Sequence, residues 1–239
     1  MELLLLSNST QHGHGYLEHA LGVVTGFVPS GGTLVFVPYA LDDHDAYTAT
    51  VRAALEPSGI TVRGVHEAGD PVGALTGADA VFVGGGNSFR LLRALYATGL
   101  RDALGGAVRG GLRYMGASAG TNMACPTLRT TNDMPIVEPP SFAALGLLPF
   151  QINPHYLDPA PGGTHMGETR EQRLTEFLEC NDVPVLGLRE GTWLRVSGSR
   201  AELGGALPAR LLRRGQEPAE LPAGSDVSVL LSASPAFDS

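Results

Sequence analysis

The sequence predicts an α/β fold, a mostly parallel sheet wrapped by helices in three layers, with antiparallel hairpins near the C-terminus. Short apolar runs of strand length alternate with stretches whose apolar residues recur at i, i+3 and i+4, and most of the runs are apolar throughout, as in strands covered on both faces. The runs are Leu3–Leu6, Thr33–Val37, Thr61–Val65, Ala80–Val83, Leu112–Met115 and Val183–Leu188. The helical stretches include Tyr16–Val24, Asp45–Leu55, Ser88–Ala97 and Thr169–Leu178.

The chain from Thr192 onward has a different pattern. TWLRV, AELGG, ARLL and DVSVLLS are strand-like segments separated by turns rich in Gly, Ser and Pro, so we expect antiparallel hairpins added to the core. Residues 126–149 hold five prolines and little periodicity, which indicates a long functional loop. No repeat or low-complexity linker interrupts the 239 residues, and we expect one domain over residues 1–239.

Composition argues against several classes of function. The net charge is −8 with no basic block, and no apolar run approaches the roughly 20 residues that span a bilayer, so neither a nucleic-acid nor a membrane partner is expected. All 16 basic residues are Arg, which excludes a lysine Schiff base, a Ser–Lys dyad and a P-loop. Cys125 and Cys180 are far apart and outside any Cys/His cluster, which argues against structural zinc and favours a reducing cytoplasm.

The strongest motif is Gly116-Ala117-Ser118-Ala119-Gly120, between the strand-like LRYM and a segment, TNMA, that can continue as a helix. GxSxG in this context is typical of a nucleophile elbow, in which small neighbours permit a strained turn and the serine hydroxyl projects above the sheet. The alternative is an ordinary turn in a Gly-rich chain, and the strand context disfavours it.

A second glycine-rich turn, residues 83–87 (VGGGN), also follows an apolar strand and precedes an amphipathic helix. Its amides can point at a phosphate or an oxyanion, but the spacing is not GxGxxG. Parallel strands collect ligands at their carboxyl ends, so the two turns together suit acyl transfer: Ser118 attacks, and the amides of Gly86 and Ala119 hold the oxyanion. Asn87 is a further candidate for contacting the substrate.

A general base and an orienting acid complete this chemistry. His155 follows the apolar run LLPFQI and can stand at a strand's carboxyl end with Ser118. Either of two carboxylates can orient it: Glu190, directly after the strand-like VPVLGL, or Asp133, in the Pro-rich loop. Both chain orders build a triad, because the roles are geometric.

These residues resemble the peptidase E family of bacterial aspartyl dipeptidases. The matching segments are MELLLLSNST, VGGGNSFRLL, GASAGTNMACPTLRTTNDMPIVEP, INPH, GETREQR and the Glu-Gly-Thr-Trp after VLGL, and they extend from residue 1 to about Trp193. The resemblance implies a cofactor-free serine peptidase with the class I glutamine-amidotransferase-like fold, a flavodoxin-like arrangement of three layers. It also implies release of the N-terminal aspartate from Asp-X dipeptides.

Matched by position, the resemblance implies that Ser118 is the nucleophile and His155 the general base. It implies that the amides of Gly86 and Ala119 form the oxyanion hole. No metal or organic cofactor is implied.

The third triad member stays open between Asp133 and Glu190, with Glu190 favoured. The resemblance implies that Arg170, in GETREQR, meets the aspartyl carboxylate of the substrate, which suits a planar guanidinium that grips a carboxylate with two hydrogen bonds. His165 is a further candidate pocket residue. One departure is Ala117, where the family pattern has Trp, and this change is expected to reshape the edge of the pocket.

The sequence therefore predicts a serine dipeptidase for small Asp-X peptides, monomeric or homodimeric. Two alternatives stay open: a related β-aspartyl or cyanophycinase-like amide hydrolase, and a catalytically silent homologue that binds ligand. An esterase of the α/β-hydrolase type shares GxSxG, but the last histidine is His165, so none follows an acid near the C-terminus.

Overall fold

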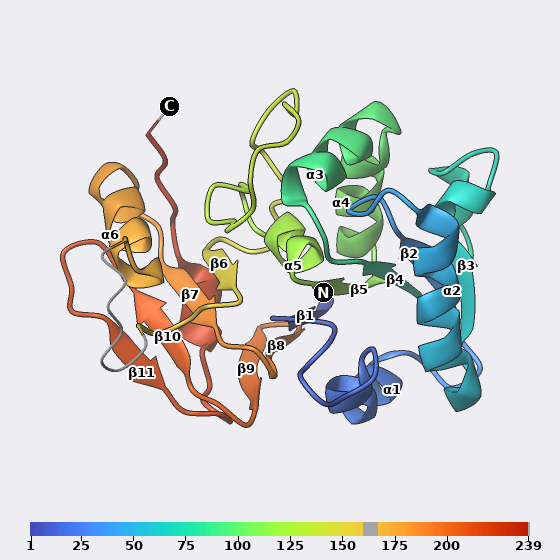
Figure 1. The fold of residues 1–239 in the computed structure, drawn as a ribbon, viewed down its shortest axis with the longest axis horizontal. Coiled ribbons are helices and arrows are strands. Elements are labelled where there is room, and N and C mark those ends of the chain that lie inside the picture. Colours follow the sequence, from blue (N-terminus) through green and yellow to red (C-terminus); the bar gives the residue numbers. More distant parts are fainter. Residues whose placement is uncertain (160–166, 239) are drawn as a thin grey trace.

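The computed structural model describes residues 1–159 and 167–238, in which two sheets lie side by side (Figure 1). The main sheet has the strand order β3-β2-β4-β5-β1-β8-β9. Its strands are β1 (Glu2–Leu6), β2 (Thr33–Val37), β3 (Thr61–Gly64), β4 (Ala80–Val83), β5 (Arg113–Ala117), β8 (Thr192–Ser197) and β9 (Arg200–Gly205). The first five in that order are parallel, and β8 and β9 extend the sheet by antiparallel pairing.

Helices cover both faces of the main sheet because its central strands are apolar on both faces. The helices are α1 (Leu21–Phe27), α2 (His44–Leu55), α3 (Ser88–Ala97), α4 (Leu100–Arg109), α5 (Ala119–Ala124) and α6 (Arg170–Cys180). In β1, Leu3 and Leu5 belong to the core beneath α3, α4 and α5, whereas Leu4 and Leu6 belong to the core beneath α1 and α2. Figure 1 shows the two groups of helices on opposite sides of the sheet.

Polar side chains cap the N-termini of α2, α3 and α6. Asp43 accepts a hydrogen bond from the amide of Ala46 at the start of α2, and Asn87 accepts one from the amide of Arg90 at the start of α3. A capping box begins α6 at Thr169. Short 3-10 helices occupy Glu18–Ala20, Glu56–Ser58, Val65–Glu67, Gly73–Leu75 and Ser228–Ser232.

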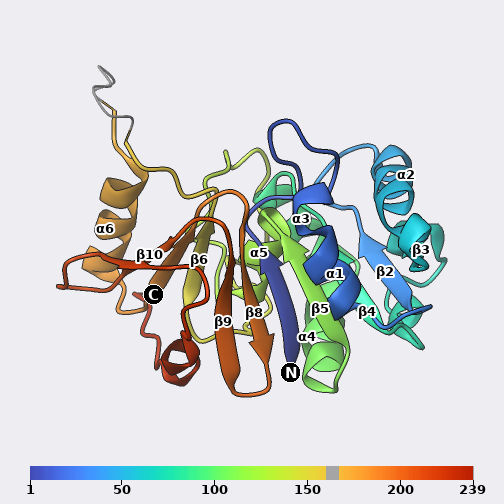
Figure 2. The same ribbon diagram turned by 90° about the horizontal axis from the view of Figure 1, so that it is seen from below.

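The second sheet is smaller and has the order β11-β10-β7-β6 (Figure 2). Its strands are β6 (Gln151–Pro154), β7 (Val185–Leu188), β10 (Ala209–Leu212) and β11 (Ala219–Leu221). Strands β6 and β7 are parallel, and the other pairs are antiparallel. Helix α6 packs on this sheet through Leu174 and Leu178, which contact the buried side chains of Val185 and Leu212.

The predicted fold class is confirmed, and β2, β4 and α3 have the predicted bounds. The prediction of a strand in DVSVLLS is wrong, because Ser228–Ser232 is a 3-10 helix and β10 pairs with Ala219–Leu221 instead. The side chain of Asp226 accepts a hydrogen bond from the Ser228 amide, and this local contact turns the chain after a single β-bridge to β9. Among the described residues, no helix has the length and apolarity needed to cross a membrane.

Candidate active site

Ser118 occupies the turn between β5 and α5, at the carboxyl end of β5. Its backbone has φ 53° and ψ −111°, a conformation that residues other than glycine rarely adopt. The Ser118 amide donates to the Leu6 carbonyl oxygen at 3.1 Å, and the Ser118 carbonyl accepts from the amides of Thr121 and Asn122, which begins α5. Backbone contacts on both sides therefore hold the turn.

The glycines that flank Ser118 are required by close contacts between backbone segments. A Cβ at Gly116 would lie 2.5 Å from the carbonyl oxygen of Gly120, and a Cβ at Gly120 would overlap the carbonyl oxygen of Val83. These obstacles are backbone atoms of a sheet and a helix, so they cannot move aside as the end of a flexible side chain can. The GxSxG motif therefore reflects the packing of a strained turn rather than a chance run of small residues.

His155 and Glu190 extend from the second sheet toward Ser118. His155 follows β6 and Glu190 follows β7. The Nε2 atom of His155 lies 2.8 Å from the Ser118 Oγ, and the Nδ1 atom lies 2.7 Å from the Glu190 Oε1. Both the histidine and the carboxylate are partly open to solvent, with side-chain exposures of 38% and 54%. Of the two carboxylates that the sequence offers, Glu190 is the one that contacts His155.

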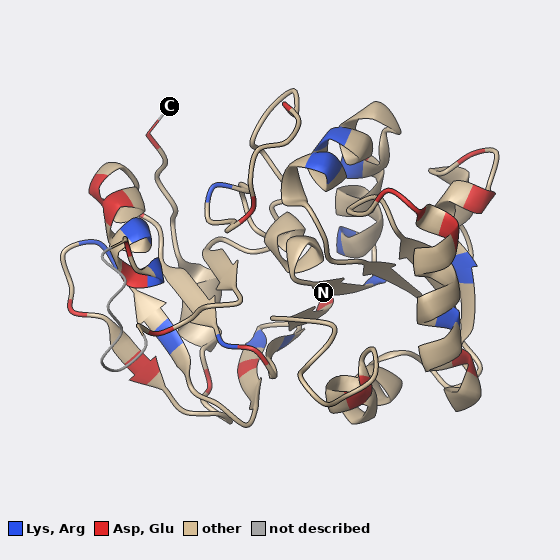
Figure 3. Ribbon diagram, viewed as in Figure 1, with Lys and Arg blue, Asp and Glu red and all other residues tan. Residues whose placement is uncertain are grey.

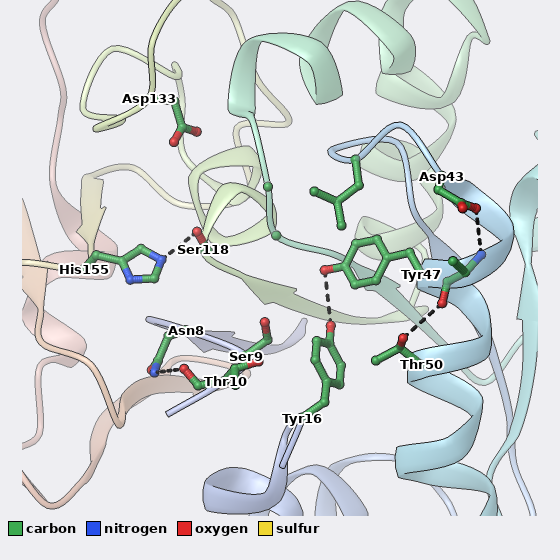
Figure 4. A pocket seen from close by; sticks show the side chains of 14 residues that line it. Asn8, Ser9, Thr10, Tyr16, Asp43, Tyr47, Thr50, Ser118, Asp133 and His155 are labelled. Atoms are coloured by element: carbon green, nitrogen blue, oxygen red, sulfur yellow. Dashed lines mark hydrogen bonds between the residues drawn. The ribbon is translucent and has the colours of Figure 1, made fainter. Parts of the chain in front are cut away.

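Asp133 lies above Ser118 in the view of Figure 4, away from the His155 ring, and has different partners. Its Oδ2 accepts hydrogen bonds from the amide of Ser88, at 2.7 Å, and from the Ser88 hydroxyl. Ser88 is fully buried and is the first residue of α3, directly after the glycine-rich turn. Asp133 therefore ties the loop of residues 126–149 to the N-terminus of α3, and it also lines the pocket in front of Ser118.

The glycine-rich turn after β4 passes directly beside the nucleophile turn. A Cβ at Gly85 would lie 3.1 Å from the Ser118 Cβ. Gly86 has φ 132°, and a Cβ there would lie 2.6 Å from the carbonyl oxygen of Ala40. Within the described residues, the amides of Gly86 and Ala119 donate no hydrogen bond to the protein, which leaves both available to a ligand.

The side chain of Asn87 forms hydrogen bonds to backbone groups of the protein. Its Oδ1 caps α3, and its Nδ2 donates to the carbonyl of Met134 at 2.9 Å. The side chain is not part of the pocket wall that includes Ser118.

The pocket in front of Ser118 has a volume of about 820 Å³. Its wall consists of Asn8, Ser9, Thr10, Tyr16, Leu41, Asp43, Ala46, Tyr47, Thr50, Gly85, Gly86, Ser118, Asp133 and His155. Figure 4 shows Ser118, His155 and Asp133 at one end and the side chains from α2 at the other. Residues 8–10 are not among the predicted site residues, although SNST follows β1 at its carboxyl end, where ligands of such sheets bind.

Two tyrosines form part of this wall and were also missed. The Tyr16 hydroxyl donates to the Tyr47 hydroxyl at 3.2 Å. Burial raises the pKa of both phenols, so both hydroxyls are protonated at neutral pH. In the sequence, Tyr47 is an apolar position of an amphipathic helix, so periodicity alone assigns it to the core. Ala117, expected to reshape the pocket edge, is fully buried in the core and absent from the wall.

Arg170 begins α6 and lines a separate, smaller pocket of about 220 Å³. Asp133 belongs to the walls of both pockets. Burial and the neighbouring Arg173 lower the pKa of Arg170, and Asp133 opposes the shift. The structure thus brings Arg170 near Asp133 but not into the wall around Ser118. His165 lies outside the described residues.

An ion-pair cluster supports the segments next to His155 and Glu190. This Arg189 cluster consists of Arg189, Asp158, Glu220, Arg210 and Glu171. The guanidinium of Arg189 is mostly buried and binds both Asp158 and Glu220. Figure 3 shows both signs of charge gathered around α6 and the second sheet.

Comparisons with known proteins agree with this architecture. The chain is 75% identical over 238 residues to a peptidase E from Streptomyces coelicolor, covering 100% of this chain and 98% of the relative. It is 54% identical over 232 residues to a probable alpha-aspartyl dipeptidase from Drosophila melanogaster, covering 96% and 97%. The crystal structure of a putative peptidase E from Listeria monocytogenes has a TM-score of 0.66 at 24% identity, covering 85% of this chain and 98% of that one, and supports the fold.

The sequence model of peptidase family S51 matches residues 3–204. This match includes Ser118, His155 and Glu190 as well as both glycine-rich turns. The resemblance to the peptidase E family is confirmed by the relatives named above. The chain therefore belongs to peptidase family S51 and is a serine peptidase.

Proposed function

We propose that this protein is a dipeptidase that hydrolyses Asp-X dipeptides through an acyl-enzyme on Ser118. The observation that carries the proposal is the hydrogen-bonded series Glu190, His155, Ser118, with distances of 2.7 and 2.8 Å. Nucleophile, base and orienting acid within such reach are the arrangement that acyl transfer needs. The name of one relative, a probable alpha-aspartyl dipeptidase, supports an aspartyl dipeptide as the substrate.

In the proposed reaction, His155 Nε2 takes the proton of the Ser118 hydroxyl as Oγ bonds to the carbonyl carbon of the N-terminal residue. The amides of Gly86 and Ala119 donate to the oxyanion that forms. The imidazolium then gives its proton to the leaving amine as the C–N bond breaks. Water, deprotonated by His155, attacks the acyl-enzyme and releases the acid.

Glu190 has a supporting role in this scheme. Its carboxylate accepts the Nδ1–H of His155, so Nε2 is left to face Ser118, and it stabilises the imidazolium when that forms. The proposed reaction uses neither a metal nor an organic cofactor. We expect the enzyme to be a monomer or a homodimer. We expect it to act in a reducing cytoplasm.

We assign the substrate's α-ammonium to Asp133. One oxygen of the carboxylate accepts a hydrogen bond from Ser88. The carboxylate also lines the pocket beside Ser118, where the free N-terminus of a substrate would lie. An ammonium in a partly buried site requires such a counter-charge. Arg170, across Asp133 in the adjoining pocket, is then the candidate partner for the aspartyl side-chain carboxylate.

Hydrolysis of Asp-Leu, Leu-Leu and Asn-Leu in a buffer containing a chelator tests the proposal, with Ser118→Ala as the control variant. We expect cleavage of Asp-Leu alone and its loss in the variant. The proposal fails if Ser118→Ala keeps a near-normal rate. It also fails if β-Asp-Arg is cleaved and Asp-Leu is not, an outcome that would identify a β-aspartyl hydrolase.

A further inference from the structure

Residues 6–8, which are the last residue of β1 and the two that follow it, contact the backbone that carries the candidate triad. The carbonyl of Leu6 accepts the amide of Ser118 at 3.1 Å. The hydroxyl of Ser7 accepts the amide of His155 at 2.9 Å. Neighbouring residues at the end of one strand therefore hold the nucleophile and the base, although the base follows a strand of the other sheet.

Asn8 makes the third contact of this series. Its Oδ1 accepts the amide of Gly191 at 2.8 Å, and its Nδ2 donates to the carbonyl of Thr10 at 3.0 Å. Gly191 follows Glu190 directly and has φ 79°, a turn conformation suited to glycine. Asn8 thus fixes the turn that carries the orienting carboxylate.

The position of Ser7 at the border of the two sheets makes its hydroxyl a junction. Ser7 is fully buried, its hydroxyl donates to the carbonyl of Leu188 at the end of β7, and its amide donates to the carbonyl of Thr192 in β8. The backbone of His155, whose amide donates to the same hydroxyl, has φ 53°. This uncommon backbone conformation persists only where surrounding contacts determine it.

We propose that Ser7 and Asn8 are positioning residues that set the spacing of Ser118, His155 and Glu190 across the border of the two sheets. The inference rests on the proposed function, because it assumes that the Ser118–His155 pair performs the chemistry. The two members of that pair follow strands of different sheets. A shift of one sheet relative to the other would therefore change the distance between Ser118 Oγ and His155 Nε2, over which the proton moves. A misplacement of about 1 Å can cost roughly a hundredfold in rate.

The test compares Ser7→Ala with Ser7→Thr and with a matched control, Ser228→Ala. The Ser228 hydroxyl also accepts a backbone amide, that of Ala201 at 2.9 Å, but on the far strand β9. For Asp-Leu hydrolysis by Ser7→Ala we expect kcat to fall about tenfold to a hundredfold with KM within about twofold. Ser7→Thr, which keeps the hydroxyl, is expected to recover most of the loss, and Ser228→Ala to match the wild type.

A double-mutant cycle separates positioning by Asn8 from a general structural effect. If Asn8 acts through Glu190, Asn8→Ala lowers kcat in the wild type but has little further effect in a Glu190→Gln background. Equal losses in both backgrounds would overturn the role of Asn8. Circular dichroism and thermal melting establish that each variant is folded, and if Ser7→Ala does not fold, Ser7→Thr and the Asn8 cycle decide the question.

Labelling of Ser118 by a serine-directed phosphonate distinguishes failure of this inference from failure of the proposed function. The labelling rate depends on the Ser118–His155 pair and on no particular peptide. If the wild type is labelled but does not cleave Asp-Leu, the proposed substrate is wrong, and the inference is judged on slower labelling of Ser7→Ala. A folded Ser7→Ala with kcat and labelling rate within about twofold of the wild type, or with a change in KM alone, would overturn the inference.

Discussion

Glu190 and Asp133 have different jobs in the proposed mechanism, so neutralising each should change a different kinetic constant. Glu190→Gln keeps the size of the side chain and an oxygen that can accept the His155 Nδ1–H, but it removes the charge that stabilises the imidazolium. Asp133→Asn keeps an acceptor for Ser88 but removes the charge facing the substrate's α-ammonium. We expect the first substitution to lower kcat and the second to raise KM.

The magnitude for Glu190 follows from its contact and its exposure. A hydrogen bond to a charged group contributes about 1.5–3 kcal/mol net, which corresponds to roughly a 10- to 150-fold change in kcat. The hydrogen bond between Glu190 and His155 is 2.7 Å long, but the Glu190 side chain is 54% exposed. Water can therefore make up part of the lost stabilisation when the charge is removed. We therefore expect a loss near the lower end, roughly 10- to 30-fold.

The assay is Asp-Leu hydrolysis over a range of substrate concentrations, with Glu176→Gln, an exposed glutamate on α6, as the control for loss of a carboxylate. A second substrate, N-acetyl-Asp-Leu, lacks the α-ammonium, so Asp133→Asn should make no further difference to it. The reasoning is refuted if Glu190→Gln keeps more than half of the wild-type kcat. It is also refuted if Asp133→Asn lowers kcat about tenfold at unchanged KM, which would make Asp133 the orienting acid.

Three further predictions concern stability and reactivity. Gly120→Ala, whose Cβ would meet a backbone carbonyl of β4, should lower the free energy of unfolding by about 1–3 kcal/mol. Gly106→Ala, whose Cβ would enter open space on α4, should raise the free energy of unfolding by about 0.5–1 kcal/mol. Denaturant titration of both variants measures the contrast, and equal effects would contradict it. Burial raises the pKa of Cys125 to about 12, so iodoacetamide should label Cys180 alone until the protein is denatured, and mass spectrometry showing native Cys125 labelled would disprove this. Arg189→Met should lower the Tm by roughly 2–4 °C at pH 7, about 1 kcal/mol after allowance for solvent screening. Hydrogen bonds from Arg189 lower the pKa of two carboxylates of the Arg189 cluster in the folded state, so this stabilisation is lost as the pH falls through those values, and a deficit that stays constant down to pH 3 would be contrary to the prediction.

The parts of the fold that the sequence predicts best are those in which local pattern and tertiary burial agree. Strand β4 is apolar at every position and buried at every position, and its bounds are the predicted ones. Helix α3 begins at a polar cap and repeats its apolar residues with helical spacing. In Ser228–Ser232 the two disagree: the apolar residues favour a strand, but a side-chain contact from Asp226 begins a 3-10 helix.

For the candidate site, local pattern identifies the turns but not the distances between them. GxSxG and the glycine-rich turn are each continuous in sequence, so their place at strand ends is predictable. The choice between Glu190 and Asp133 is not, because it depends on how β6 and β7 meet the main sheet, a pairing between distant segments. The role of Ser7 depends on the same border and has no sequence signature, since a serine after a strand is commonplace.

The division of the site between two sheets has a consequence for how activity relates to stability. Ser118 and both candidate oxyanion amides follow strands of the main sheet, whereas His155 follows β6 of the smaller sheet and Glu190 lies in the connection from β7 to β8. One hydrophobic cluster includes residues of both sheets, such as Leu5 of β1 and Leu186 of β7, whereas α6 packs on the smaller sheet through a separate cluster. A change that loosens the border without unfolding either sheet would therefore separate base from nucleophile. Because proton transfer depends steeply on that separation, the catalytic rate should respond to the fit of the two sheets before the melting temperature does.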